Sequence, residues 1–401
     1  MSSVRALLLE TLHPQATDIL NAADIAVDNR AGALDEDELI EALQGVHLLG
    51  LRSKTHVTER VLREATDLIA IGAFSIGTNQ IDLAAAARFG IAVFNAPFSN
   101  TRSVVEMALS EMISLTRRLP EHNRQMHAGV WSKSAIGAHE IRGRTLGIVG
   151  YGNIGSQLSV IAEALGMNVI FFDNAEKLAL GNATKMPTLE SLLNEADIVT
   201  LHVDGRSGNS GFFGRDQFAA MKHGALLLNL SRGFIVDLDA LKAGLESGQI
   251  GGAAVDVYPV EPKVKGDSFS SPLQNIPNVI LTPHIGGSTE EAQCDIGIFV
   301  ATRLRDFVHS GSTSLSVNLP NLSLELQQGS HRIVHLHINT PGVLAAVNHV
   351  FAEHGVNIEA QMLATRGELG YVVTDVSAGL TDDAVEALSD MQATVRLRVL
   401  S

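Results

Sequence analysis

The sequence contains 401 residues, of which 45% are hydrophobic, so it can bury large cores and is too long for one compact domain. Its 44 acidic residues exceed its 29 basic ones, and the net charge of −15 argues against nucleic-acid binding through a general basic surface. The single cysteine, Cys294, excludes an intramolecular disulfide and a cysteine-rich zinc site. No secretory signal and no apolar run of membrane-spanning length is present, which predicts a cytoplasmic protein.

The first hundred residues alternate short apolar runs with helical patterns, which is typical of a parallel sheet covered by helices. We expect helices over residues 35–43 and 80–89, and a long helix over residues 103–119, where Ser103 and Glu106 form a predicted capping box. The predicted strands lie at residues 4–9, 25–28, 46–50, 68–72 and 91–94.

The middle of the chain repeats this alternation, and its strands have the continuous apolar character of a sheet buried on both faces. A helix predicted over residues 289–308 leads back to the first unit, and the Ser/Thr/Gly-rich stretch 310–316 is interpreted as a linker. The predicted strands lie at residues 145–149, 168–172, 197–203, 225–230, 252–257 and 279–282.

The last seventy residues have the order βαββαβ, which is the ferredoxin-like pattern of a small independent domain. The sequence therefore predicts an α/β protein with two Rossmann-like, doubly wound parallel-sheet domains and a C-terminal ferredoxin-like domain. The predicted strands of this domain lie at residues 333–338, 356–364, 370–377 and 394–400, and its helices at 342–354 and 381–391.

A glycine-rich turn follows the predicted strand at residues 145–149. Gly150, Gly152 and Gly155 form the G-x-G-x-x-G pattern of dinucleotide-binding loops, in which glycines allow a tight turn, approach of the pyrophosphate, and close helix packing. Asp173 ends the next strand, where a carboxylate accepts hydrogen bonds from the adenosine ribose and repels a 2′-phosphate. No arginine adjoins Asp173. The pattern predicts NAD rather than NADP, and a purely structural turn does not require Asp173.

Three polar residues follow three strands of this unit: Arg232, Glu261 and His284. Ligands bind at the carboxyl ends of strands in open α/β sheets, so these side chains can line one crevice. A histidine suits proton transfer near pH 7, a carboxylate raises its pKa, and an arginine holds a carboxylate with two hydrogen bonds. Taken singly, each is more often a structural or surface residue. Together, each beside glycine or proline, they predict oxidation of an alcohol by NAD.

The chain resembles the D-isomer-specific 2-hydroxyacid dehydrogenase family, most closely its members with a C-terminal ACT domain. The resemblance implies that Arg232 binds the substrate's carboxylate and carbonyl, that His284 transfers the proton, and that Glu261 tunes His284. It covers essentially the whole chain and is densest at residues 50–53, 71–80, 94–102, 129–131, 147–155, 229–233, 259–262 and 283–288. It further assigns to NAD the residues Asn153, Ile154, Leu230, Ser231, Arg232, Asp256, His284, Ile285, Gly286 and Gly287.

The resemblance also implies the domain boundaries. Residues 1–99 with 288–328 would form an outer substrate-binding domain, 100–287 the NAD-binding domain, and 329–401 the ACT domain, with the active site between the first two. The sequence departs from the family at Asp204, where many relatives carry proline, in the glycine-rich run 205–214, and at Leu230, which replaces a smaller residue. We expect the glycine-rich run to weaken NAD binding.

A phosphorylated substrate needs local cations in a chain of net charge −15. A lone basic residue is more often a solvated surface charge, but Arg52 follows a predicted strand and adjoins Ser53. The resemblance implies oxidation of 3-phospho-D-glycerate to 3-phosphohydroxypyruvate, the first step of L-serine biosynthesis. The same cations suit the second carboxylate of 2-oxoglutarate, so we expect its reduction to 2-hydroxyglutarate as a side activity. The candidate substrate residues are Arg52, Ser53, Lys54, Asn100, Arg102 and Lys133.

In the C-terminal domain, the strand-to-helix turn at Pro341 and Gly342 offers free N–H groups to a carboxylate. The resemblance implies L-serine bound by His337, Asn339 and Asn357 across two ACT domains, and hence feedback inhibition. The histidines do not indicate a metal site because neither carboxylate nor cysteine accompanies them. A purely dimerising ACT domain remains an alternative.

Two self-associating surfaces, the ACT edge and the surface near Trp131, would give a homotetramer. Two further functions remain open: a related dehydrogenase whose ACT domain senses another amino acid, and a non-catalytic NAD-responsive binding protein similar to the corepressors that resemble these enzymes. A turnover assay separates the second from an enzyme.

Overall fold

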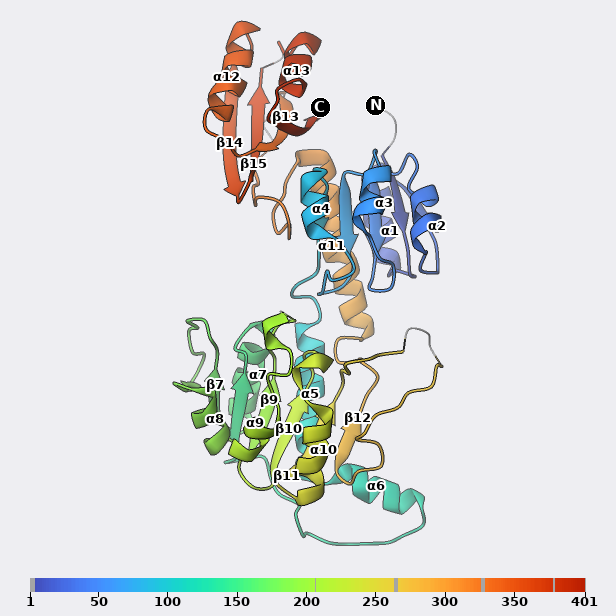
Figure 1. Cartoon of the computed structure of the whole chain (residues 1–401), viewed down its shortest axis with the longest axis vertical. Coiled ribbons are helices and arrows are strands. Elements are labelled where there is room, and N and C mark those ends of the chain that lie inside the picture. The colour runs from blue at the N-terminus through green and yellow to red at the C-terminus, as the bar shows by residue number, and fades with distance from the viewer. Residues whose placement is uncertain (1–3, 206, 263–265, 326–328, 378, 401) are drawn as a thin grey trace. The chain divides into compact units, whose positions relative to one another are not determined.

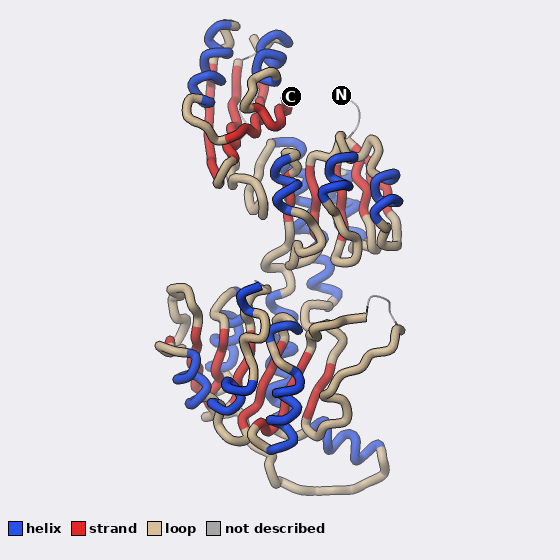
Figure 2. The backbone as a smooth tube through the Cα atoms, viewed as in Figure 1, coloured by secondary structure: helices blue, strands red, loops and turns tan. Residues whose placement is uncertain are grey.

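The computed structural model describes residues 4–205, 207–262, 266–325, 329–377 and 379–400. The chain forms two compact units, one of Met1–Ser99 with Gln293–Ser401, and one of Asn100–Ala292. Figures 1 and 2 show the strands of these units in three sheets. In the described part of the chain, none of the helices combines the length and apolar character that a bilayer crossing needs.

The first sheet has five parallel strands in the order β2-β1-β3-β4-β5. Alternate residues of β1 face opposite sides: Leu8 packs with α1 and α11, and Leu7 packs with α2, α3 and α4. The strands are β1 (Arg5–Leu8), β2 (Ala26–Asn29), β3 (Leu48–Leu51), β4 (Ala70–Ala73) and β5 (Ala92–Phe94). The helices are α1 (Pro14–Asn21), α2 (Glu36–Ala42), α3 (Glu59–Glu64), α4 (Leu83–Arg88) and α11 (Glu290–Ser310), which begins in the second unit.

The second sheet has seven parallel strands in the order β12-β11-β10-β9-β6-β7-β8. Helices α5 and α7 cover one face, and α8, α9 and α10 cover the other. The strands are β6 (Thr145–Val149), β7 (Asn168–Phe172), β8 (Thr184–Lys185), β9 (Ile198–Leu201), β10 (Ala225–Asn229), β11 (Ile250–Val255) and β12 (Val279–Leu281). The helices are α5 (Thr101–Thr116), α6 (Leu119–His127), α7 (Asn153–Ala164), α8 (Leu189–Glu195), α9 (Arg215–Ala220) and α10 (Leu238–Ser247), with short 3₁₀ turns at Ser207–Asn209 and Gly233–Ile235.

The third sheet is antiparallel, in the order β14-β15-β13-β16, and two helices cover one of its faces (Figure 1). Ile333 packs against these helices, whereas Val334 and Leu336 on the other face belong to the core around α11. This is the predicted ferredoxin-like arrangement, and the α/β class with parallel sheets is confirmed. The elements are β13 (His331–Ile338), α12 (Val343–Glu353), β14 (Ile358–Arg366), β15 (Leu369–Val376), α13 (Asp382–Ser389) and β16 (Thr394–Leu400).

The predicted capping box at the start of α5 is wrong. The helix begins at Thr101 after Asn100, so Ser103 lies inside its first turn instead of capping it. The Ser103 hydroxyl lies 2.9 Å from the hydroxyl of Thr289, and the Glu106 carboxylate accepts a hydrogen bond from Arg102.

The predicted linker at residues 310–316 is also wrong. Thr313 is completely buried, and its hydroxyl donates to the carbonyl of Pro320 at 2.7 Å. Ser316 forms a backbone bridge with Phe94 of β5. The polar side chains in this stretch therefore satisfy the backbone of a packed loop and do not mark a solvated connection.

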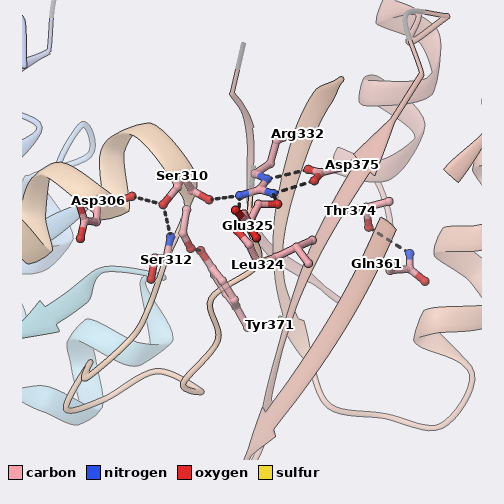
Figure 3. Close-up of polar contacts among 11 residues, drawn as sticks. Asp306, Ser310, Ser312, Leu324, Glu325, Arg332, Gln361, Tyr371, Thr374 and Asp375 are labelled. Carbon is pink, nitrogen blue, oxygen red and sulfur yellow. Dashed lines mark hydrogen bonds and ion pairs between the residues drawn. The ribbon is translucent and has the colours of Figure 1, made fainter. Parts of the chain in front are cut away.

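A buried arginine joins the third sheet to the end of α11 (Figure 3). Arg332 on β13 binds both oxygens of Asp375 on β15, at 2.6 and 2.7 Å, and both side chains are completely buried. The guanidinium also donates to the carbonyls of Ser310, Leu324 and Glu325 at 2.8–3.0 Å. A single side chain thus satisfies a buried charge and three backbone acceptors where the chain passes from helix to sheet.

We expect Arg332→Met to destabilise this unit by about 3–5 kcal/mol, because it leaves the Asp375 charge buried without a partner. Thermal unfolding measures the loss. The double variant Arg332→Met/Asp375→Leu serves as the control and should recover much of it, since both charges are then gone. A single variant that unfolds like the wild type would contradict the role given to this pair.

Candidate active site

The turn between β6 and α7 has the geometry of an anion cradle. Gly150 has a φ of +94°, and a Cβ there would lie 2.6 Å from the carbonyl oxygen of His202. At Gly155, a Cβ would lie 2.3 Å from the carbonyl of Gly150, so the helix packs directly on the turn. A larger residue at either position would force the turn open.

Gly152 borders open space, since none of the residues that the structure describes has an atom within 4 Å of the Cβ that Gly152 lacks. It precedes the first turn of α7, where Asn153 and Ile154 lie, and no side chain in the described part of the chain caps this helix end. Uncapped N–H groups and the helix dipole favour an anion at this point. The turn therefore fits the pyrophosphate of a dinucleotide.

Asp173 follows β7 and lies beside this turn. Its two carboxylate oxygens accept hydrogen bonds from the N–H groups of Tyr151 and Ala175, both at 2.8 Å. The carboxylate borders a cavity of about 470 Å³, which Lys185 also lines. The Lys185 ammonium lies 3.1 Å from the exposed carboxylate of Glu176. A cation therefore stands near Asp173, although the sequence shows no basic residue adjacent to it.

Arg232 is held by the turn that follows β10. The completely buried Asn229 accepts hydrogen bonds from the N–H and hydroxyl of Ser231, and its amide donates to the carbonyl of Arg232. At Gly233, a Cβ would lie 1.9 Å from the backbone of Tyr258, so the turn lies directly against the segment that follows β11. That segment carries Glu261.

His284 and Glu261 form a hydrogen-bonded pair. The Nδ1 atom of His284 lies 2.8 Å from a carboxylate oxygen of Glu261, and both side chains remain partly exposed. The other carboxylate oxygen accepts from the N–H of Tyr258 at 3.1 Å. The hydrogen bond between His284 and Glu261 raises the pKa of His284 above its ordinary value, against the opposing effect of burial. Burial raises the pKa of Glu261, but hydrogen bonds from His284 and Tyr258 outweigh it, and the pKa falls.

The positive charge of Arg232 lowers the pKa of both His284 and Glu261, so the guanidinium lies within electrostatic range of the pair. The structure thus brings the three predicted catalytic side chains together at the carboxyl edge of one sheet. The glycine-rich run that departs from the family also reaches this point, because a Cβ at Gly205 would lie 3.2 Å from the Nε atom of Arg232.

Asp256 fixes the loop that carries His284. It is almost completely buried at the end of β11, and its carboxylate accepts hydrogen bonds from the N–H groups of Ile285 and Gly286, both at 2.8 Å. The Thr282 hydroxyl donates to the same group at 2.6 Å, and the backbone N–H of His284, whose φ is +55°, donates to the carbonyl of Asp256.

The remaining predicted NAD residues lie against this loop. A Cβ at Gly286 would lie 3.6 Å from the side chain of Leu230, and a Cβ at Gly287 would overlap the amide of Asn100. The segments after β10 and β12 and the start of α5 therefore meet in one place.

The predicted substrate residues are not all gathered at this edge. Asn100 adjoins Gly287, but Arg102 is exposed and lies 2.6 Å from Glu106. Lys133 lies in the loop that enters the sheet at the amino end of β6, which is the opposite edge. Arg52, Ser53 and Lys54 belong to the other compact unit, in the loop after β3.

The predicted effector residues lie at two ends of the third sheet. His337 is buried near the end of β13 and pairs with Gly370, and Asn339 follows that strand. Asn357 is exposed and immediately precedes β14. A strand about 20 Å long separates these positions, so one chain does not bring the three side chains together.

The structure adds residues to which the sequence analysis gave no role. Asn229 and Gly233 shape the Arg232 turn, and Tyr258 binds Glu261. Glu111, a buried carboxyl group on α5, could have been found from the sequence, because it is a charged residue within the apolar stripe of that helix. Lys185 lies in a two-residue strand, which is too short to give a pattern.

Comparison with known proteins agrees with this geometry. Residues 109–286 match the model of the D-isomer specific 2-hydroxyacid dehydrogenase NAD binding domain, and residues 333–396 match an AHAS small subunit-like ACT domain. A D-lactate dehydrogenase from Aquifex aeolicus, solved with NAD and lactic acid, is 25% identical with a TM-score of 0.66, covering 76% of this chain and 95% of that one. A D-2-hydroxyisocaproate dehydrogenase has a TM-score of 0.71 at 25% identity, covering 79% of this chain and all of the other.

The chain belongs to the D-isomer-specific 2-hydroxyacid dehydrogenase family and is an NAD-dependent D-2-hydroxyacid dehydrogenase. Among its curated relatives, the D-3-phosphoglycerate dehydrogenase of Haemophilus influenzae is 49% identical over 400 residues, covering 100% of this chain and 98% of the relative. The enzyme of the same name from Dictyostelium discoideum is 45% identical, covering 99% of this chain and 97% of the relative.

Glu111 is a buried carboxyl group beneath this site. Its side chain points into the core from α5, and neither carboxyl oxygen has a hydrogen-bond partner among the described residues. Burial, together with the charge of Asp256, raises the pKa of Glu111 to about 8. The native protein therefore keeps a proton that the unfolded chain releases above its ordinary pKa of 4.5.

This difference makes Glu111 destabilising as the pH rises from about 4.5 towards 8, because the unfolded chain binds fewer protons. We compare the free energy of unfolding of Glu111→Gln with that of the wild type. We expect the difference to shift in favour of the variant by about 3 kcal/mol between pH 4 and pH 7. Urea unfolding across this range measures the effect. Glu106→Gln, an exposed change on the same helix, is the control, and parallel stability curves for Glu111→Gln and wild type would contradict the prediction.

Proposed function

We propose that this enzyme oxidises 3-phospho-D-glycerate to 3-phosphohydroxypyruvate with NAD in the cytoplasm, as the first step of L-serine biosynthesis. The observation that carries the proposal is the His284–Glu261 pair with Arg232 at the edge of the sheet that also holds the dinucleotide turn. Full-length similarity to relatives named D-3-phosphoglycerate dehydrogenase supports the choice of substrate.

His284 serves as the general base. NAD, when bound, accepts the hydride from the carbon that bears the hydroxyl group. Because the Nδ1–H of His284 donates to Glu261, the Nε2 lone pair remains to take the hydroxyl proton. In the reverse direction the protonated imidazole returns this proton to the carbonyl oxygen. The hydrogen bond with Glu261 raises the pKa of His284, so the protonated form that reduction needs persists to higher pH than for a free imidazole, and oxidation improves as the pH rises.

Arg232 holds the substrate. One of its terminal nitrogens donates to the carbonyl of Ser231 at 2.7 Å, which fixes the guanidinium plane. A guanidinium has five N–H donors, and those that remain suit the substrate's carboxylate and carbonyl oxygen. The same group lowers the pKa of Glu261, which keeps the partner of His284 ionised.

The loop after β3 is proposed to bind the phosphate. Arg52 is partly exposed and Lys54 exposed, and in the described part of the chain their side chains make no ion pair. Two unpaired cations beside the Ser53 hydroxyl suit a phosphate. They also suit the second carboxylate of 2-oxoglutarate, so we propose its reduction as a side activity. Arg102, which already binds Glu106, and Lys133 are weaker candidates.

The ACT domain is proposed to bind L-serine between two copies of the chain. β14 is an edge strand of its sheet, and Asn357 lies at one end of it. If two copies pair antiparallel through β14, Asn357 of one copy comes to lie at the same end of the joined sheet as His337 and Asn339 of the other. Such a site forms only in an oligomer, which supports feedback inhibition coupled to assembly.

A second self-associating surface surrounds Trp131, which is 81% exposed. Leu119, Met126 and Val130 are also exposed, and together these residues line a shallow cavity of about 290 Å³. An apolar surface of this kind supports assembly with another copy, and with the ACT edge it gives the proposed homotetramer. An ACT domain that senses another amino acid remains the alternative.

We expect His284→Ala to lose at least about a hundredfold in turnover, because the hydroxyl proton then has no acceptor. NAD binding, measured by fluorescence titration, should change little. The comparison separates an enzyme from a binding protein, since a binding protein has negligible turnover before the substitution. Retained turnover in the variant would refute the acid–base role.

The substrate and the effector can be tested in one NADH-dependent assay. We expect 3-phosphohydroxypyruvate to be reduced with a higher kcat/KM than 2-oxoglutarate, and 2-oxoglutarate with a higher kcat/KM than pyruvate, because phosphate and the second carboxylate both need cations. L-Serine should inhibit the wild type, and Asn339→Ala should weaken the inhibition while keeping activity. Equal rates on all three acids, or full serine sensitivity in the variant, would contradict these assignments.

A further inference from the structure

The Glu10 carboxylate accepts hydrogen bonds from the backbone of the candidate phosphate loop, which follows β3. Glu10 follows β1, and its side chain is buried. One carboxylate oxygen accepts hydrogen bonds from the N–H groups of Ser53 and Lys54, both at 3.1 Å, and the other accepts from Thr55 at 2.8 Å. Three consecutive N–H groups of the loop after β3 therefore converge on one charged acceptor.

The backbone at Glu10 is set for this contact. Glu10 and Thr11 have φ values of +64° and +53°, in the left-handed region that residues with a Cβ seldom adopt. Such conformations persist only where surrounding contacts hold them. Charge-assisted hydrogen bonds to three N–H groups are contacts of that strength. The turn after β1 and the loop after β3 are thus held by one another.

A second contact holds the other end of the loop. The Gln80 amide donates to the carbonyl of Arg52 and lies 3.4 Å from the hydroxyl of Ser75. Thr55 is completely buried. Anchoring the backbone at both ends leaves the side chains of Arg52 and Lys54 outside the contact, where the described residues offer them no ion pair.

We infer that Glu10 is a positioning residue for substrate binding, and that the loop receives the phosphate through its side chains and not through its backbone. Consecutive N–H groups that point at one spot form an anion-binding nest. Here Glu10 already fills that nest. A dianionic phosphate at the same spot would meet the carboxylate and be repelled. The inference rests on the proposed function, in which Arg52, Ser53 and Lys54 bind phosphate.

The test compares NADH-dependent reduction of 3-phosphohydroxypyruvate and of hydroxypyruvate, which lacks only the phosphate. In Glu10→Gln, one of the two acceptor oxygens becomes an NH2 group, which faces at least one N–H group of the loop and loosens the loop at that end. We expect KM for the phosphorylated substrate to rise at least about tenfold. The kcat on both substrates and KM for hydroxypyruvate should stay within about twofold of wild type.

Two further variants make the result specific. Glu10→Asp keeps the charge but is one methylene shorter, so we expect a smaller rise in KM, and it decides the question if Glu10→Gln does not fold. Asp35→Asn changes a carboxylate that binds a backbone N–H at the start of α2, in the same unit. A general loss of stability would act equally in this control, which should keep the wild-type preference for phosphate.

The preference for the phosphorylated substrate separates the possible failures. If the wild type shows the preference and both Glu10 variants keep it unchanged, the inference is overturned and the proposed function stands. Tighter binding of the phosphorylated substrate in Glu10→Gln would also overturn it, because the opened nest would then be the phosphate site. A wild type without the preference would overturn the proposed substrate, and the inference with it.

Discussion

The buried Asp256 carboxylate is the contact on which the candidate catalytic edge depends. It accepts hydrogen bonds from the Thr282 hydroxyl and from two backbone N–H groups of the loop that carries His284. Removing an acceptor of this kind would leave several donors unsatisfied in a dry environment, so the loop has little freedom to rearrange. The loop fixed in this way carries His284, whose Nδ1 atom lies 2.8 Å from Glu261.

Carboxylates at other strand ends also accept hydrogen bonds from the backbone of a neighbouring loop. Asp173 binds the N–H of Tyr151 within the dinucleotide turn, and Glu10 binds three N–H groups of the loop after β3. Parallel strands end together at one edge, where their loops lack partners in the sheet. A carboxylate from one strand end supplies the missing acceptors for a neighbouring loop. It therefore orders the edge where ligands bind and adds negative charge, which cations such as Arg232 must offset.

Within the first unit, the ACT sheet is joined to the end of α11 by a different kind of contact. Arg332 pairs with Asp375 and donates to the carbonyl of Ser310, the last residue of α11, while the Tyr371 hydroxyl donates to the carbonyl of Gly311 at 2.6 Å. Arg398 donates to the last carbonyls of α11, at Phe307 and Val308. Three strands of the ACT sheet, β13, β15 and β16, are thus hydrogen-bonded directly to the end of the long helix and the residue that follows it.

The sequence by itself determined the alternation of strands and helices and the position of the dinucleotide turn, because apolar periodicity and short glycine motifs are local properties. From the same local signals it predicted Arg232, Glu261 and His284 as the catalytic residues. It missed the packed loop around Thr313 and misplaced the start of α5. In both places polar side chains form hydrogen bonds with residues outside their own turn or helix. Only the tertiary structure decided that Glu111 is buried without a hydrogen-bond partner among the described residues, that Glu10 binds a loop more than forty residues away, and that Asn357 lies apart from His337. These depend on which strand ends meet, and that is fixed by sheet order, a property of the whole chain.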